Sequence, residues 1–187
     1  TGLDDMLFKY GVRIMPDLIL DLECSSIPQV VGMSGDKPQT KLFPWVYHMA
    51  AASEIQNPVV KNIDRVNLFF PSTIDTVKTE GNVKKTMLLK SSKYSRSQLS
   101  PVRLSFEILK VAPDPSKFND GNRPVAYLLE GEFESFFKNR LTPEFQSMLD
   151  RIEVKFKDKS IPAKQIVISD SDFAKNLVNT NNGQTED

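Results

Sequence analysis

Two pairs of carboxylates stand out in this chain of 187 residues. Glu130 and Glu132 are separated by one glycine and follow an apolar stretch, and Asp170 and Asp172 are separated by one serine and follow another. Paired carboxylates can divide acid and base roles when their surroundings separate the two pKa values. They can also bind a cation or a sugar hydroxyl. Residues two apart in extended backbone point to the same face, so Glu130 and Glu132 can act together.

Each pair also has a structural explanation, which we favour. A solvated sheet edge accounts for Glu130 and Glu132, with the glycine between them supplying a backbone turn. A helix that begins after a strand would be capped by Asp170, and its dipole would be complemented by Asp172. We therefore keep the four carboxylates as candidate contacts for a ligand or partner, and we predict no catalytic residue among them.

An aromatic cluster at residues 43–47 contains two further candidates, Trp45 and Tyr47. Large aromatic side chains with one polar atom serve equally as core anchors and as platforms for a ligand. Anchoring is the favoured explanation. Trp45 and Tyr47 nevertheless complete the set of candidate binding residues.

Composition excludes several classes of function. One cysteine and one histidine are too few for an internal disulfide or for the usual zinc and iron sites, so we expect no metal and no cofactor. Lysine plus arginine equal aspartate plus glutamate at 24 each, which gives no overall field for nucleic acid. No glycine-rich phosphate loop and no recognisable nucleophile context occurs, so we predict that the protein is not an enzyme.

Hydrophobic periodicity indicates which helices, strands and loops carry the candidate residues. The spacing predicts a helix at 3–10, a second from Thr142 to residue 152, and a short third at 170–177. Residues 25–44, rich in proline and glycine, predict a long loop or a hairpin with short strands. The segment 133–140 would place Phe133 and Phe137 on one face if it were helical. The expected strands cover residues 12–15, 18–22, 66–70, 83–89, 102–108, 125–129 and 163–169.

Helices that alternate with strands predict an α/β fold. Residues 1–178 would form one domain, and the polar residues 179–187 a disordered tail.

Several ordered segments of the chain resemble one known family. They are LDDMLFKYGVRI (3–14), LFPW (42–45), NPVVKNID (57–64), residues 91–96 with PVRLS (101–105), PVAYLLEGEFESFFKNR (124–140) and IVISDSDF (166–173). Their order is similar to that in the GldG family, the gliding-motility-associated auxiliary components of ABC transporters in Bacteroidetes. The resemblance extends over most of the chain, about Leu3 to Asn176.

The resemblance implies a fold, a location and partners. The implied fold is a layered, Rossmann-like mixed sheet flanked by helices, related to amidotransferase-like domains that have lost catalysis and here truncated at the N-terminal edge of its sheet. The chain is then expected to be the soluble part of a larger, membrane-anchored protein on the periplasmic side of the cytoplasmic membrane. Its implied partners are the permease and ATPase subunits of the transporter, and its implied role is that of a binding or scaffold module.

Two other functions remain open. A carbohydrate-binding or degenerate hydrolase-like domain could use the same six residues, Glu130, Glu132, Asp170, Asp172, Trp45 and Tyr47, to hold a saccharide or another envelope ligand. An intracellular structural protein, related to intraflagellar-transport proteins, is the third possibility.

Overall fold

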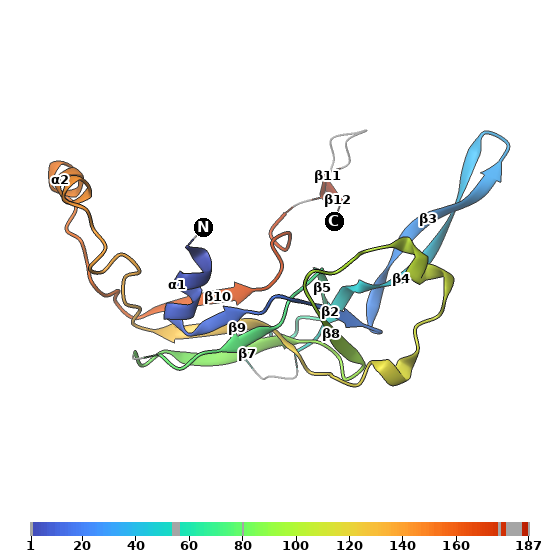
Figure 1. The fold of residues 1–187 in the computed structure, drawn as a ribbon, viewed down its shortest axis with the longest axis horizontal. Coiled ribbons are helices and arrows are strands. Elements are labelled where there is room, and N and C mark those ends of the chain that lie inside the picture. Colours follow the sequence, from blue (N-terminus) through green and yellow to red (C-terminus); the bar gives the residue numbers. More distant parts are fainter. Residues whose placement is uncertain (1, 54–56, 80, 176, 179–184, 187) are drawn as a thin grey trace.

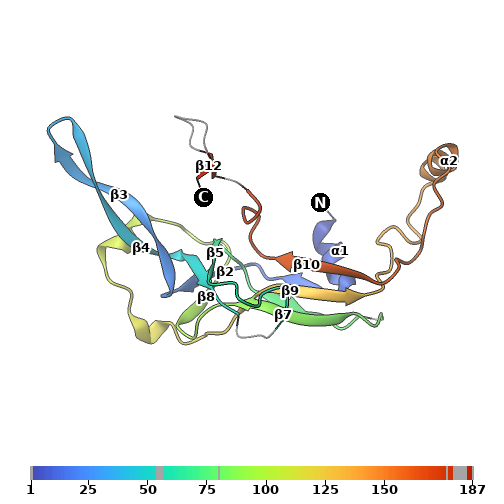
Figure 2. The ribbon, with the colours of Figure 1, turned by 180° about the vertical axis from the view of Figure 1, so that it is seen from behind.

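The computed structural model describes residues 2–53, 57–79, 81–175, 177–178 and 185–186. Antiparallel strands form an elongated body with one projecting arm at each end, as both views show (Figures 1 and 2). One arm is a long two-stranded hairpin. The other carries a short helix. Both arms extend well beyond the strands of the body.

The body consists of several small sheets rather than one large sheet. The three-stranded sheets have the orders β10–β9–β7, formed by Ala163–Ile168, Pro124–Gly131 and Lys84–Lys90, and β3–β4–β5, formed by Cys24–Ser34, Lys37–Ala51 and Val66–Phe69. The two-stranded pairs are β1–β6, formed by Val12–Ile14 and Ile74–Thr76, and β2–β8, formed by Asp17–Asp21 and Ser95–Leu99. All of these pairings are antiparallel.

The expectation of a Rossmann-like α/β fold, truncated or not, is wrong. That fold requires parallel strands joined by helical crossovers of a dozen or more residues. Here the described strands pair antiparallel, and the two α-helices, α1 (Leu3–Tyr10) and α2 (Pro143–Arg151), do not alternate with the strands of a common sheet. Six of the seven expected strands exist, so the error lies in how strands were assumed to pair.

The two helices were predicted and have different environments. Helix α1 ends at Gly11, whose φ of 101° is left-handed, and it buries Leu7 against Val12 and Leu129. Helix α2 begins after Thr142, whose side chain accepts a hydrogen bond from the Phe145 amide. None of the residues in α2 is buried, so no side chain of this helix is part of the hydrophobic core.

Two other local predictions are wrong, and the condition set for residues 133–140 is not met. Residues 102–105 form no strand, and Phe106–Lys110 is the 3-10 helix η1, although this segment alternates like a strand. The segment 133–140 is not helical, and Phe133 is 4% exposed whereas Phe137 is 57% exposed. Residues 170–175 form bends and a turn rather than a helix.

The predicted loop or short-stranded hairpin at 25–44 is instead a long ribbon. Strand β3 has 11 residues and β4 has 15, and only the C-terminal end of β4, from His48 to Ala51, pairs with β5. The ribbon is buried at its root, where Trp45 and Tyr47 lie, and its tip half projects from the body (Figure 1).

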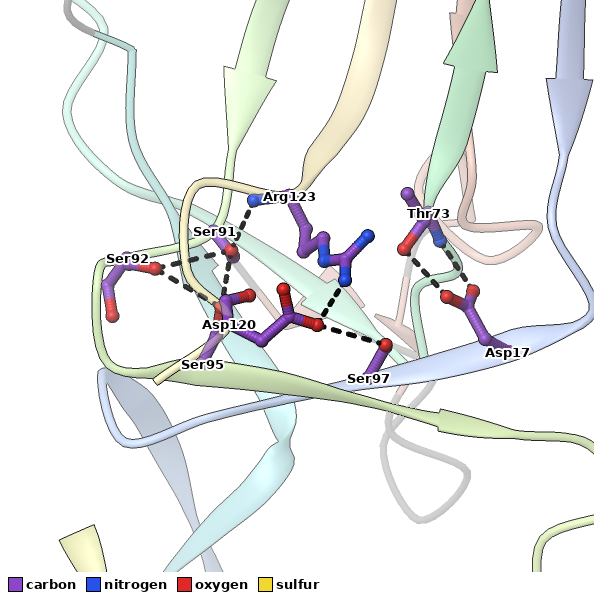
Figure 3. A network of polar contacts seen from close by, with 8 residues as sticks. All are labelled: Asp17, Thr73, Ser91, Ser92, Ser95, Ser97, Asp120 and Arg123. Carbon is purple, nitrogen blue, oxygen red and sulfur yellow. Dashed lines mark hydrogen bonds and ion pairs between the residues drawn. The ribbon is translucent and has the colours of Figure 1, made fainter. Parts of the chain in front are cut away.

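Buried polar groups join the strands of the body where apolar contacts end. The Asp17 carboxylate accepts hydrogen bonds from the amide and hydroxyl of Thr73, both at 2.8 Å, and the Ser91 and Ser95 hydroxyls bond each other at 2.7 Å (Figure 3). The Arg123 amide donates to Ser91 Oγ. This serine-rich segment thus satisfies buried backbone and hydroxyl groups, which is a structural role.

The C-terminal end is described only in part. Residues 179–184 and 187 of the expected tail lie outside the described residues, while β11 (Leu177–Val178) and β12 (Thr185–Glu186) pair antiparallel. A remaining 3-10 helix, η2, covers Pro115–Lys117. Within the described ranges, neither helix has the length and apolar character that crossing a membrane requires.

Candidate functional site

Glu130 lies in a cross-strand row of charges. In the register of the sheet its β9 position is opposite Lys84 of β7 and Lys164 of β10. Its carboxylate lies 2.9 Å from Lys164 Nζ and 3.8 Å from Lys84 Nζ. The hydrogen bond from Lys164 is the largest cause of a lowered pKa for Glu130, so this group is an ionised partner of two lysines.

Glu132 has a different partner, because the strand ends between the two glutamates. It pairs with Lys159. Gly131 has a φ of 154°, and a Cβ there would lie 2.8 Å from the carbonyl oxygen of Asn82. The glycine is therefore required for the close approach of two backbones. The two glutamates do not face each other as an acid and base pair.

Asp170 anchors backbone from two segments. Its Oδ2 accepts from the Phe69 amide at 2.7 Å, and its Oδ1 accepts from the Asp172 amide at 2.7 Å. Asp172 pairs with Lys175, whose hydrogen bond is the main cause of the lowered pKa of Asp172. Asp170 thus caps local backbone without a helix behind it.

The acidic pairs occupy opposite ends of one sheet. Gly131 pairs with Ala163 at one end of β9, whereas Ile168 pairs with Ala126 near the other. At about 3.3 Å per residue, the five steps from Ala126 to Gly131 separate the ends by roughly 16 Å. The structure therefore does not bring Glu130 and Glu132 together with Asp170.

Trp45 and Tyr47 are in contact, with ring centroids 5.3 Å apart, and both are buried. Tyr47 stacks on Phe70 at 6.0 Å, and burial raises the pKa of the Tyr47 hydroxyl. Trp45 contacts Phe106 of η1 at 5.4 Å. The cluster is a core anchor, yet one side of Trp45 also lines a pocket.

This aromatic pocket lies where the hairpin joins the body and has a volume of about 380 Å³. Its lining comes from β3, β4, the residue after β5, and the segment leading into η1. The lining residues are Ile27, Gln29, Trp45, His48, Phe70, Leu104, Ser105 and Phe106. Asp170 fixes the backbone next to one lining residue, since it accepts a hydrogen bond from the amide of Phe69, which precedes Phe70.

Among the lining residues the sequence marked only Trp45 as a candidate, and His48 is a polar lining residue that it did not mark. Its ring contacts Phe69 at 4.5 Å and Phe70 at 5.3 Å. Burial lowers the pKa of His48, and the nearby Asp170 carboxylate opposes that shift. The imidazole is therefore neutral at pH 7, with one nitrogen as donor and the other as acceptor. The neighbouring Phe70 has a φ of 52°, a left-handed conformation that costs a bulky residue energy.

The projecting hairpin has an apolar face. In the register, Pro28 lies opposite Leu42, and Met33 opposite Pro38. An irregularity between Val30 and Gly32 inserts one extra residue, which returns Met33 to the face that carries Pro28 and Leu42. Val30 shares this face, opposite Thr40, which is its one polar member between Pro28 and Met33.

We name this set, Pro28, Val30, Met33, Pro38 and Leu42, the apolar ribbon face. Exposure is 64% for Val30, 64% for Met33 and 65% for Leu42. The opposite face is polar outside the root of the hairpin and carries Gln29, Ser34, Lys37, Gln39 and Lys41. An exposed apolar strip with a polar reverse is a feature of protein interfaces.

No arrangement for covalent catalysis appears among the described residues. Burial raises the pKa of the Cys24 thiol, which disfavours the thiolate that a nucleophile needs. No hydrogen bond within the described part joins Cys24 to His48. The same part of the chain holds no group of three or more histidine, cysteine or acidic side chains placed to bind a metal.

The described chain thus combines a β-rich body, a projecting amphipathic ribbon and a neutral aromatic pocket. The chain belongs to the family described as an ABC-type uncharacterized transport system, whose model matches residues 1–187. Its members are auxiliary components of ABC-type transport systems. No curated protein and no solved structure matches the chain.

Proposed function

We propose that this chain is a non-enzymatic scaffold module that binds a transporter subunit through its apolar ribbon face. The observation that carries the proposal is the exposure of Val30, Met33 and Leu42 on one face of a hairpin that projects from the body. Family membership supplies the partner, because an auxiliary component of a transport system acts on the other subunits of that system.

The chemistry of the ribbon indicates what kind of partner surface it can bind. Leucine, methionine and valine on a flat strand pair fit a complementary apolar surface on a folded protein. The projecting parts of β3 and β4 also have backbone groups on their outer edges that are free to pair with a strand of the partner. Side chains and backbone can thus engage the same permease or ATPase subunit.

We further propose that the module works on the periplasmic side of the cytoplasmic membrane and takes part in gliding motility. The resemblance of several sequence blocks to the GldG family is the support for both points. Protease added to intact spheroplasts would cleave a periplasmic module and spare a cytoplasmic one. Disruption of the gene should abolish colony spreading, and unchanged spreading would remove the motility assignment.

The binding proposal is tested by co-purification of the transporter from detergent extracts. The variant Val30→Ser/Met33→Ser/Leu42→Ser should reduce the recovered transporter subunits at least tenfold. Leu99→Ser is the matched control, because Leu99 is also highly exposed but lies at the end of β8 in the body. Equal recovery with the triple variant and the wild type would overturn the proposal.

The carbohydrate-binding alternative receives less support. Its six residues do not converge, because the two acidic pairs lie at opposite ends of the β9–β10 pair and are engaged by lysines or backbone amides. A saccharide site usually brings several hydrogen-bonding side chains to one place. We therefore base the proposed function on the apolar ribbon face.

A further inference from the structure

The aromatic pocket at the root of the hairpin is a small-molecule site in size and build. Its volume of about 380 Å³ lies within the range of roughly 300–1,000 Å³ that is usual for ligand pockets. A dry apolar cavity of about 150 Å³ already holds benzene. The pocket therefore has room for a single substituted ring.

The residues that line the pocket disfavour a charged ligand. None of the eight lining side chains is an acid, a lysine or an arginine. His48 is neutral at pH 7, because burial lowers its pKa. An anionic ligand would lose its hydration here without gaining a positively charged partner, which is a large cost.

The aromatic lining residues also favour a ligand with an aromatic ring. Trp45, Phe70 and Phe106 enter the pocket from β4, the end of β5 and the start of η1. Aromatic rings pack edge-to-face or in offset stacks with other rings, and such pairs add to the burial of their area. Trp45 already meets Phe106 at a tilt of 41°.

His48 supplies the specific polar contact. Its ring is held by Phe69 and Phe70, and within the described residues its nitrogens make no hydrogen bond. By contrast, Gln29 Nε2 donates to the Pro28 carbonyl, and Ser105 Oγ accepts from the Glu107 amide. One fully available polar group matches a ligand with one polar substituent.

We propose that this pocket binds one uncharged aromatic ring that carries a single hydrogen-bonding substituent, with the ring among Trp45, Phe70 and Phe106 and the substituent on His48. A pyranose has several hydroxyls, and most of them would remain unsatisfied in this lining. This ligand site is separate from the apolar ribbon face and does not depend on the proposed scaffold function.

Trp45 is the only tryptophan in the chain, so its fluorescence reports directly on the pocket. Titration of the whole chain with benzamide should give a saturable change, with a dissociation constant of about 1 mM, as expected for so small a ligand. Benzoate has the same shape and a negative charge, and it should bind at least about tenfold more weakly. Methyl glucoside should produce no saturable change.

Two variants assign the roles. His48→Phe keeps an aromatic wall and removes the polar contact, so it should weaken benzamide binding about fivefold or more while binding of toluene is retained. Phe106→Ala should weaken both ligands. Tyr94→Ala is the matched control, because Tyr94 is an exposed aromatic residue outside the pocket, and it should change neither.

Circular dichroism and thermal melting establish that each variant is folded. A benzamide response that does not saturate would overturn the proposal, as would equal binding of benzoate or saturable binding of methyl glucoside. Unchanged benzamide affinity in folded His48→Phe would remove the assigned polar contact.

Discussion

The carboxylate of Asp170 accepts a hydrogen bond from the amide of Phe69 at 2.7 Å, across 101 positions of sequence. Its other oxygen accepts from the Asp172 amide. One side chain thereby joins the segment after β10 to the end of β5. That junction is next in sequence to Phe70, which lines the aromatic pocket.

Asp170→Ala should destabilise the fold by about 1–3 kcal/mol, because two backbone amides lose their acceptor. Urea denaturation followed by circular dichroism measures this change. Asp170→Asn should fall between the alanine variant and the wild type, since the amide keeps one acceptor oxygen. Asp172→Ala is the control and should leave the midpoint unchanged, because its ion pair with Lys175 is at the surface. Equal midpoints for Asp170→Ala and the wild type would contradict this role.

Gly131→Ala should lower the free energy of unfolding by about 1–3 kcal/mol, through a strained backbone and a clash. The added Cβ would lie 2.8 Å from the Asn82 carbonyl oxygen. Gly32→Ala is the matched control, because a Cβ at Gly32 meets only the end of the Gln39 side chain, at 3.8 Å. Similar losses of unfolding free energy in the two variants would show that the close approach to Asn82 is not the reason that position 131 requires glycine.

Alanine substitutions of a buried and an exposed leucine should have different effects on stability. Leu20→Ala should cost about 2–5 kcal/mol, because Leu20 is fully buried beside Trp45 and Tyr47. Leu42→Ala should change the stability of the isolated chain by less than about 0.5 kcal/mol, because Leu42 is exposed on the ribbon. Thermal and urea denaturation of both variants test the pair. A large loss in Leu42→Ala would mean that the apolar ribbon face packs against the body.

The single histidine makes stability depend on pH near neutrality. Burial lowers the pKa of His48 below the usual 6.5, so between the lowered value and 6.5 the unfolded chain binds more protons than the folded chain. Stability therefore falls as the pH drops through that window. Urea denaturation at pH 7.5, 6.5 and 5.5 should show this fall in the wild type.

His48→Phe should lose that part of the pH dependence, and the difference between the two proteins isolates it from carboxylates that titrate at lower pH. Proton NMR of the imidazole in the folded chain gives an independent measurement. A pKa at or above 6.5 for His48 would contradict the prediction.

Local signals in the sequence were sufficient for some elements. Helix α1 has aspartates in its first turn and a glycine at its end, and α2 has a threonine cap followed by proline, so each is specified by its own residues. Strands β5, β7 and β10 were expected at 66–70, 83–89 and 163–169, each within a residue or two of the bounds found.

Tertiary contacts decided the remainder. The alternation at 102–108 indicates a strand, but the segment from Phe106 packs across Trp45 as the 3-10 helix η1. Antiparallel pairing is set by contacts far apart in sequence, which periodicity does not encode. His48 became a candidate only when the fold placed it between Phe69 and Phe70, because a lone histidine in a strand carries no signal of its own.

The length of β4 has a mechanical consequence. One uninterrupted strand runs from Lys37 at the hairpin tip to Ala51 in the core, a span of roughly 50 Å at the rise of an extended chain. Tension applied at the tip is therefore carried by covalent backbone past Trp45 and His48 into the centre of the body. A partner that pulls on the ribbon while it moves would transmit force along β4 directly to the residues that line the aromatic pocket.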